Sequence, residues 1–161
     1  MLKQEIIVSI SSQTVQCLEM GVLLQTYAAS TAKNGVGELI NSECTPRGQH
    51  CVHKIIGREQ SENSVFVARE WTGEIYTEEL AHRFPERDWI LTRIVWLSGL
   101  VPGQNQGGDV DTKKRFIYIH GTPDTTPMGQ PGSHGCIRMR NQDVVALADW
   151  VQVGTPILIE E

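Results

Sequence analysis

The sequence lacks long apolar runs, and it lacks an excess of positive charge. No stretch approaches the roughly 20 consecutive apolar residues of a membrane-spanning helix, so membrane insertion is not expected. The formal net charge is −5 at pH 7, and the lysines and arginines are scattered along the chain. Nucleic acids and anionic membrane surfaces are therefore not expected as partners. Internal repeats and low-complexity tracts are also absent.

The beginning of the chain shows no secretory signal. Its apolar run extends only from Ile6 to Ile10, whereas a signal h-region needs roughly 7–15 apolar residues followed by a small-residue cleavage site. Cysteines are few, and such a number fits a reducing compartment in which a thiol stays unpaired: Cys17, Cys44, Cys51 and Cys136. We expect a cytoplasmic protein, or a periplasmic or cell-wall protein if the chain has been trimmed.

The length of 161 residues fits one domain over residues 1–161 with a sizeable core. Short β-branched and alternating runs, punctuated by glycine and proline, are typical of strands. They predict strands at 5–10, 14–20, 22–30, 50–56, 65–69, 73–76, 91–98, 115–119 and 157–159. Helices are expected at 77–84, capped by Thr77, and at 141–151, capped by Asn141. The predicted fold class is mainly β, a compact sandwich-like domain with one or two short helices.

The chemically richest stretch runs from Ser133 to Met139 and follows His120 by thirteen residues or more. A nucleophilic thiol needs a base to take its proton and N–H groups to hold an oxyanion. Cys136 supplies the thiol, and either His120 or His134 supplies the base and raises the thiolate fraction. Gly135 permits a tight turn that aims the N–H groups of Gly135 and Cys136 at one spot.

The same residue types also fit roles without a nucleophile. Cys136 is of a residue type that is often core filler, and His120, His134 and Cys136 are also possible metal ligands. A second cluster, Cys44, His50, Cys51 and His53, invites a zinc interpretation, but its spacing matches no standard ligand pair. In a strand, Cys51 and His53 share one face while His50 faces away. We therefore expect a structural strand there, with no metal and no cofactor.

The His-Gly-Thr at 120–122, followed by a Pro/Gly loop and the SHGCIRM segment at 133–139, resembles the signature of the YkuD-type L,D-transpeptidase catalytic domain. The resemblance extends more loosely to 45–48 and 154–156. It implies that family's topology for the whole chain. It also implies an enzyme that acts on peptidoglycan stem peptides or muropeptides, cutting or exchanging the bond between an L-centre and a D-residue through a cysteine thioester.

The resemblance also implies roles for individual residues. Cys136 corresponds to the nucleophile, His120 to the general base, and the Gly121 carbonyl to the group that orients the imidazole. The oxyanion hole would involve His134, Gly135 and Cys136. Many members carry Asn where this chain has Arg138. Because guanidinium groups pair with carboxylates in a fork, Arg138 is the first candidate for substrate binding, and Ser133 and Arg140 are further candidates.

The acyl acceptor decides the reaction. With water, the enzyme is an L,D-carboxypeptidase that trims D-alanine from tetrapeptide stems of cytosolic muropeptides during recycling, which we favour. With an amine of another stem, it is a cross-linking L,D-transpeptidase. A non-catalytic peptidoglycan-binding module and a metallohydrolase are the alternatives from other classes. The loop over 99–114 is expected to flank the substrate cleft.

Overall fold

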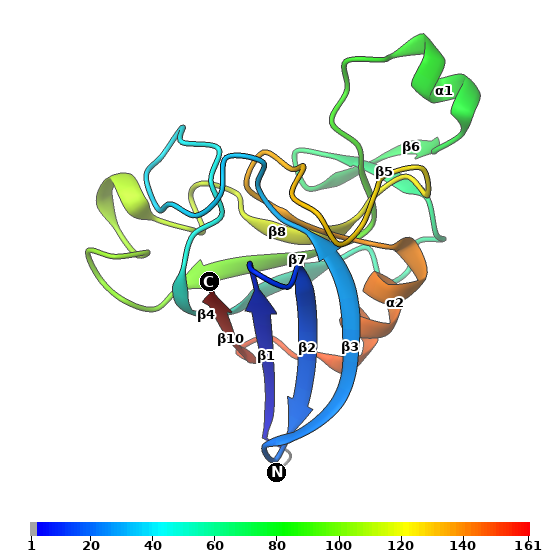
Figure 1. Ribbon diagram of the computed structural model, residues 1–161. Helices are drawn as coiled ribbons and strands as arrows, with labels where there is room; N and C mark the ends of the chain where they lie inside the picture. The colour runs from blue at the N-terminus through cyan, green and yellow to red at the C-terminus, as the bar shows by residue number, and fades with distance from the viewer. Residues whose placement is uncertain (1–2) are drawn as a thin grey trace.

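The computed structural model describes residues 3–161, in which strands are the commonest regular element (Figure 1). The strands are β1 (Gln4–Ser9), β2 (Thr14–Glu19), β3 (Val22–Ser30), β4 (Gly48–Ile56), β5 (Ser64–Val67), β6 (Glu70–Ile75), β7 (Ile90–Gly99), β8 (Tyr118–Gly121), β9 (Ile137–Met139) and β10 (Pro156–Glu160). The helices are α1 (Glu78–Arg83) and α2 (Asn141–Trp150), with a short 3₁₀ turn, η1, at Gly108–Val110. The mainly β class with two short helices is confirmed.

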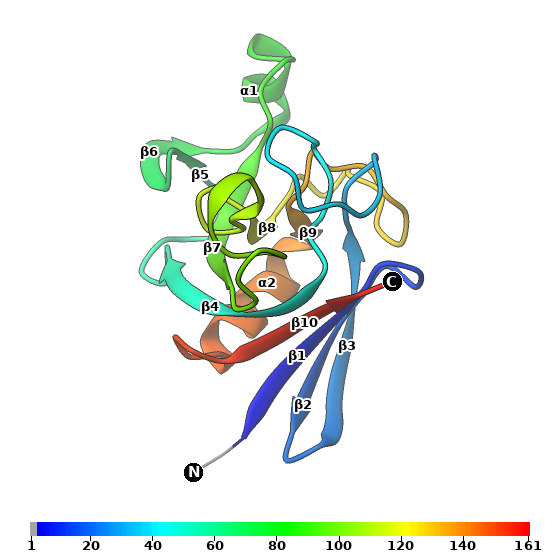
Figure 2. The same cartoon turned by 90° about the vertical axis from the view of Figure 1, so that its left-hand side faces the viewer.

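All ten strands belong to one sheet in the order β4-β10-β1-β2-β3-β9-β8-β7-β5-β6, and β7 additionally pairs with β4. This extra pairing closes eight of the strands into a barrel-like sandwich, from which the β5–β6 hairpin and α1 project (Figures 1 and 2). Closure satisfies the backbone groups that open edges would leave unpaired. Only β1–β10 and β8–β9 are parallel pairs among the described strands.

The main core fills the interior of this closed sheet. Strand residues at alternate positions face inward, as Ile6 and Val8 do on β1, where both are fully buried. Helix α2 packs against β7 and β8 and contributes Val144, Leu147 and Ala148 to the same cluster. A smaller cluster contains Phe66, Ile94 and Tyr118, with Cys136 packed against it. The nucleophile candidate therefore lies where a second, smaller apolar cluster meets solvent.

Helix α1 begins as expected, because Thr77 Oγ1 accepts the Leu80 N–H at 3.0 Å. Helix α2 does not begin as expected. Its N-cap is Arg140, without a side-chain cap, and Asn141 is instead a buried residue of the first turn. The prediction of a strand from 115 onward is also wrong at its start. Phe116 has φ +58° in a turn, and β8 begins only at Tyr118.

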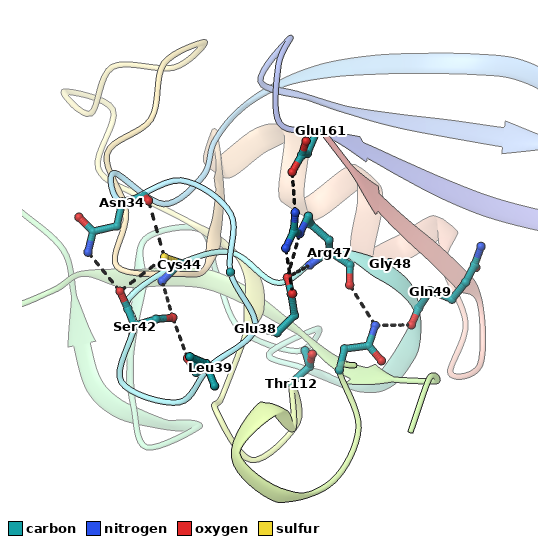
Figure 3. A network of polar contacts seen from close by, with 12 residues as sticks. Asn34, Glu38, Leu39, Ser42, Cys44, Arg47, Gly48, Gln49, Thr112 and Glu161 are labelled. Atoms are coloured by element: carbon teal, nitrogen blue, oxygen red, sulfur yellow. Dashed lines mark hydrogen bonds and ion pairs between the residues drawn. The ribbon is translucent and has the colours of Figure 1, made fainter. Parts of the chain in front are cut away.

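The loop between β3 and β4 is fixed by ion pairs and by backbone contacts (Figure 3). Arg47 pairs with Glu38 at 3.1 Å and with Glu161 at 2.7 Å. Asn105 donates Nδ2 to the carbonyls of Arg47 and Gln49, so the loop after β7 packs on this side. Residues 99–114, which were expected to flank the substrate cleft, do not line the cavity that contains Cys136, and only Lys114 among them lines the adjoining cavity of about 340 Å³.

Three further properties hold for the described residues 3–161. None of their helices combines the length and apolar character needed to cross a bilayer. All four cysteines are free thiols. No group of three or more His, Cys, Asp or Glu side chains is placed to hold a metal ion in this range, and His53 instead packs edge-on against Trp96.

Buried His50 makes the fold sensitive to acid. Its Nε2 lies 2.9 Å from Thr112 Oγ1 and its Nδ1 lies 2.9 Å from the Gly48 carbonyl. Burial lowers the pKa of His50 from 6.5 to about 4. The unfolded chain therefore binds a proton that the native state refuses, so the free energy of unfolding should fall by about 3 kcal/mol as the pH drops from 6.5 to 4. Urea unfolding at both pH values measures this.

His50→Gln is the matched variant, because it removes the titrating group and keeps a polar side chain. Between pH 6.5 and pH 4 the free energy of unfolding should fall in both proteins, but the fall should be about 3 kcal/mol smaller in His50→Gln than in the wild type. Equal changes in the two proteins would contradict the assignment.

Candidate active site

The parallel pairing of β8 with β9 builds the site. His120 lies opposite Arg138, and Ile119 lies opposite Ile137. Side chains alternate between the faces of a strand, so His120 and Arg138 share one face while the two isoleucines face the core. Cys136 directly precedes β9, two residues before Arg138, and takes the same face as His120. His120 and Cys136 are sixteen residues apart in the sequence, and the strand pairing places them on the same face of the sheet.

His120 and Cys136 line one cavity of about 250 Å³. Its other walls include Ser133, His134 and Arg138. Five of the residues expected from the sequence are therefore brought together. Arg140 is not among them, since it lines a separate cavity beside Asp124 and Gln142.

His120 is held in one orientation from behind. The ring is fully buried, and Nδ1 lies 2.6 Å from the carbonyl oxygen of Gly121. An acceptor at that distance assigns the proton to Nδ1, which leaves Nε2 with a lone pair. Burial lowers the pKa of His120, and the Gly121 carbonyl opposes this shift. The ring is thus neutral near pH 7 and suited to accept a proton at Nε2.

Cys136 is half-buried against β8. Its Sγ accepts the N–H of Tyr118 at 3.3 Å and lies 3.4 Å from the carbonyl of Phe116. Burial raises the pKa of Cys136 to about 12, although the Tyr118 N–H and the charges of Arg138 and Arg115 lower it in part. The sequence predicted that a nearby imidazole raises the thiolate fraction of Cys136, whereas the resting site lowers that fraction. Both the Cys136 thiol and the His120 imidazole are therefore neutral at rest, and the thiol donates to the Phe116 carbonyl.

The turn before Cys136 requires a glycine. Gly135 has φ +133°, and a Cβ there would lie 3.2 Å from Ile117 Cδ1 and 3.3 Å from the Cys44 carbonyl oxygen. The Gly135 carbonyl accepts a hydrogen bond from Thr45 Oγ1 at 2.9 Å. Thr45 belongs to the looser part of the family signature, and its contact here links the β3–β4 loop to the nucleophile turn.

Ser133 organises this turn from inside. Its hydroxyl donates to the carbonyl of Cys136 and accepts the N–H of Gly135 at 3.2 Å. The side chain is 2 % exposed, so it acts on the backbone more than on a ligand. Within residues 3–161, the N–H groups of His134 and Cys136 have no hydrogen-bond acceptor, whereas that of Gly135 is occupied. The free donors for an oxyanion are therefore those of His134 and Cys136.

Arg138 is tethered at the mouth of the cavity. It donates to Asp88 Oδ1 at 3.1 Å and to the Gly132 carbonyl at 3.0 Å. A guanidinium carries five N–H donors, so these two bonds orient the group without exhausting it. Sequence reasoning missed Asp88, because a residue fifty positions away in an irregular segment carries no spacing signal.

Two more arginines were missed for the same reason. Arg69 stacks 4.2 Å from the Phe116 ring centroid and donates to the Tyr118 hydroxyl at 3.0 Å, so it forms a cationic and aromatic wall of the cavity. Arg115 donates to the carbonyl of Cys44 at 2.7 Å and fixes the β3–β4 loop beside the site. Both line the cavity that contains Cys136.

Comparison with known proteins identifies the family. The family model described as YkuD, the L,D-transpeptidase catalytic domain, matches residues 3–159, so the chain belongs to this family. A curated relative, the putative L,D-transpeptidase YkuD of Bacillus licheniformis, is 27 % identical over 154 residues, which cover 96 % of this chain and 64 % of the relative.

Solved structures share the fold. L,D-transpeptidase 3 from Mycobacterium tuberculosis, in complex with a faropenem-derived adduct, superposes with a TM-score of 0.61 at 18 % identity, over 99 % of this chain and 61 % of that one. An L,D-transpeptidase from Mycobacterium smegmatis gives a TM-score of 0.57 at 18 % identity, over 99 % and 59 %. The chain thus spans less than two thirds of the length of each of these relatives.

A neutral resting thiol has a measurable consequence. Alkylation by iodoacetamide requires the thiolate, and the pKa of Cys136 is raised to about 12. The alkylation rate of Cys136, followed by peptide mass spectrometry, should therefore rise steadily between pH 6 and pH 9.5 without levelling off. A thiolate–imidazolium pair would instead give a rate that is already constant near pH 7, and that result would contradict the neutral pair. Circular dichroism at each pH controls for unfolding.

Proposed function

We propose that this chain is a cysteine-dependent acyl-transfer enzyme that acts on the L,D-peptide bond before the terminal D-alanine of peptidoglycan stem tetrapeptides. The observation that supports this most directly is the shared cavity of Cys136 and the oriented ring of His120. Membership of the YkuD family supports the substrate class. The faropenem-derived adduct is a property of the M. tuberculosis relative, and it suggests a faropenem probe here.

The first half of the reaction forms a thioester. His120 Nε2 takes the proton of the Cys136 thiol as sulfur attacks the carbonyl carbon of the L-centre. Because thiol and imidazole are both neutral at rest, proton transfer and attack occur together, and no free thiolate has to accumulate. The N–H groups of His134 and Cys136 stabilise the oxyanion, and removing one such donor typically costs about 3 kcal/mol of barrier. The C–N bond then breaks as His120 returns its proton to the leaving D-alanine amine.

The second half transfers the acyl group. We favour water as the acceptor, with His120 removing its proton as it attacks the thioester and returning that proton to sulfur. Water needs no binding site of its own, which suits a cavity of about 250 Å³. Four free thiols fit action on cytosolic muropeptides during recycling. Recovery of the protein in a wall or periplasmic fraction would contradict that location.

A second candidate is cross-linking transpeptidation, and one observation favours it. Another cavity, of about 340 Å³, shares Arg115, Phe116, Ile117 and His134 with the first. A site with an opening on either side of these shared residues has room for a donor stem on one side and an acceptor amine on the other. The products distinguish the two candidates.

Incubation with a disaccharide tetrapeptide should release D-alanine and leave the tripeptide. Intact-protein mass spectrometry during turnover should detect an acyl adduct on Cys136, because the thioester is a covalent intermediate. Cys136→Ala should lose both signals while keeping its affinity for the stem peptide. Cross-linked dimers as the main product would replace hydrolysis with transpeptidation.

Binding without turnover in the wild type would support a peptidoglycan-binding module. Turnover that survives in Cys136→Ala and stops with a chelator would support a metallohydrolase.

Arg138 is proposed to hold the terminal carboxylate of the stem. Arg138→Met should raise KM at least about tenfold, since a lost charge-assisted pair is worth roughly 1.5–3 kcal/mol. Asp88→Asn is the matched control. It breaks the 3.1 Å ion pair but keeps the guanidinium, so its KM should stay within about twofold of wild type. A substrate amidated at its C-terminus should be insensitive to Arg138→Met, and equal sensitivity of both substrates would exclude carboxylate binding.

A further inference from the structure

The peptide that follows His120 is held from two sides. The Gly121 carbonyl faces the imidazole at 2.6 Å. The next carbonyl along the chain, that of Thr122, accepts a hydrogen bond from Asn141 Nδ2 at 3.0 Å. Sheet pairing with Leu91 and Met139 holds Gly121, and the side chain of Asn141 holds the next residue, where β8 has ended.

Asn141 is itself fixed by a buried hydroxyl. Thr92 Oγ1 donates to Asn141 Oδ1 at 2.5 Å and accepts the backbone N–H of Asn63 at 3.0 Å. The second hydrogen of Asn141 Nδ2 is directed to Asn63 Oδ1 at 3.1 Å. Asn141 and Thr92 are 4 % and 0 % exposed, so these bonds are largely shielded from water. This order of donors and acceptors leaves the amide of Asn141 no freedom to flip.

Close packing adds a steric constraint. A Cβ on Gly121 would collide with Asn141 Oδ1 and would lie 2.6 Å from the Leu91 carbonyl oxygen. The Asn141 side chain is therefore pressed against the Gly121 backbone as well as bonded to the next residue. Asn141 is thus the side chain that packs against and bonds to the backbone that carries the His120 acceptor.

Thr92 is kept in an unfavourable conformation to supply its hydroxyl. It has φ +74°, which is rare for a β-branched residue and costs of order 1–3 kcal/mol. It sits at the irregularity between Leu91 and Ile94, where the pairing of β7 with β8 shifts register. The irregularity turns the threonine hydroxyl toward Asn141 instead of continuing the ladder.

We propose that Asn141 and Thr92 are positioning residues that fix the tautomer and orientation of His120 through the Gly121–Thr122 backbone. This inference rests on the proposed function, in which His120 Nε2 accepts the thiol proton. Without the clamp, the Gly121 carbonyl can turn away, the Nδ1 proton loses its acceptor, and the ring populates the tautomer with hydrogen on Nε2. That tautomer cannot accept the proton of Cys136.

The experiment compares Asn141→Leu and Thr92→Val with wild type. Mutation of the partners that orient metal-binding histidines typically costs 10–100-fold in affinity or activity, and we expect an effect of that order for His120. We therefore expect kcat for D-alanine release to fall about 10–100-fold while KM stays within about twofold. The ¹⁵N NMR spectrum of His120 should show a protonated Nδ1 and an unprotonated Nε2 in the wild type, and averaged or exchanged shifts in both variants.

Thr92→Ser is the matched variant for Thr92→Val, because serine keeps the hydroxyl that valine lacks. Its kcat and its His120 ¹⁵N shifts should return close to wild type. Asn105→Leu controls for the loss of a buried amide. Asn105 also donates to two backbone carbonyls, those of Arg47 and Gln49, and forms no hydrogen bond to β8 or β9, so this variant should lose thermal stability and keep its kcat and its ¹⁵N shifts.

Three results would overturn the inference. One is a His120 ¹⁵N spectrum that is unchanged in both Asn141→Leu and Thr92→Val. Another is a fall in kcat for Asn105→Leu as large as that for Asn141→Leu. The third is a Thr92→Ser variant as impaired as Thr92→Val. If Asn141→Leu does not fold, the two Thr92 variants decide the question. Absence of turnover in wild type rejects the proposed function, whereas the NMR comparison still tests the clamp.

Discussion

The parallel register between β8 and β9 is the constraint on which the site depends. It sets His120 opposite Arg138 and brings the residue before β9 onto the same face, so base, nucleophile and guanidinium share one surface. A shift by one residue would send these side chains into the core and bring isoleucines to the cavity. The apolar cluster that contains Ile119, Ile137 and Met139 opposes such a shift, because those residues are fully buried. Burial of the isoleucines and Met139 on one face thus fixes which side chains line the cavity on the other face.

The same burial determines the charge state of the catalytic pair. Desolvation raises the pKa of Cys136 and lowers that of His120, so both shifts favour neutral groups. Arg138 and Arg115 oppose the first shift without reversing it. A neutral pair avoids a buried charge at rest, and in the proposed mechanism the proton moves only when a substrate carbonyl receives the electrons of sulfur. The site is therefore poised for reaction with an electrophile in the cavity more than for spontaneous reaction in solvent.

Much of this could be predicted from sequence, because the relevant signals are local. Alternating apolar residues located most strands, Thr77 located the start of α1, and the His-Gly and Ser-His-Gly-Cys segments located residues that line one cavity. What could not be predicted depends on contacts between distant segments. Asparagine is a residue type that often caps helices, yet the side chain of Asn141 points inward and donates a hydrogen bond to the carbonyl of Thr122. Phe116 ends up in a turn because φ +58° is imposed by the surrounding loop. Arg69, Asp88 and Arg115 reach the cavity from irregular or hairpin segments without any periodic signal.

Closure of the barrel has a consequence for how the protein is made. Strand β10 lies between β1 and β4, so the first strand pairs on one side with the last. During synthesis, β1 and β4 keep open edges until the residues of β10 have left the ribosome, because contacts between segments that are distant in the sequence form late and slowly. The nascent chain therefore passes through a state in which only β10 is missing from the closed sheet. A chaperone that covers unpaired strand edges would act in that interval.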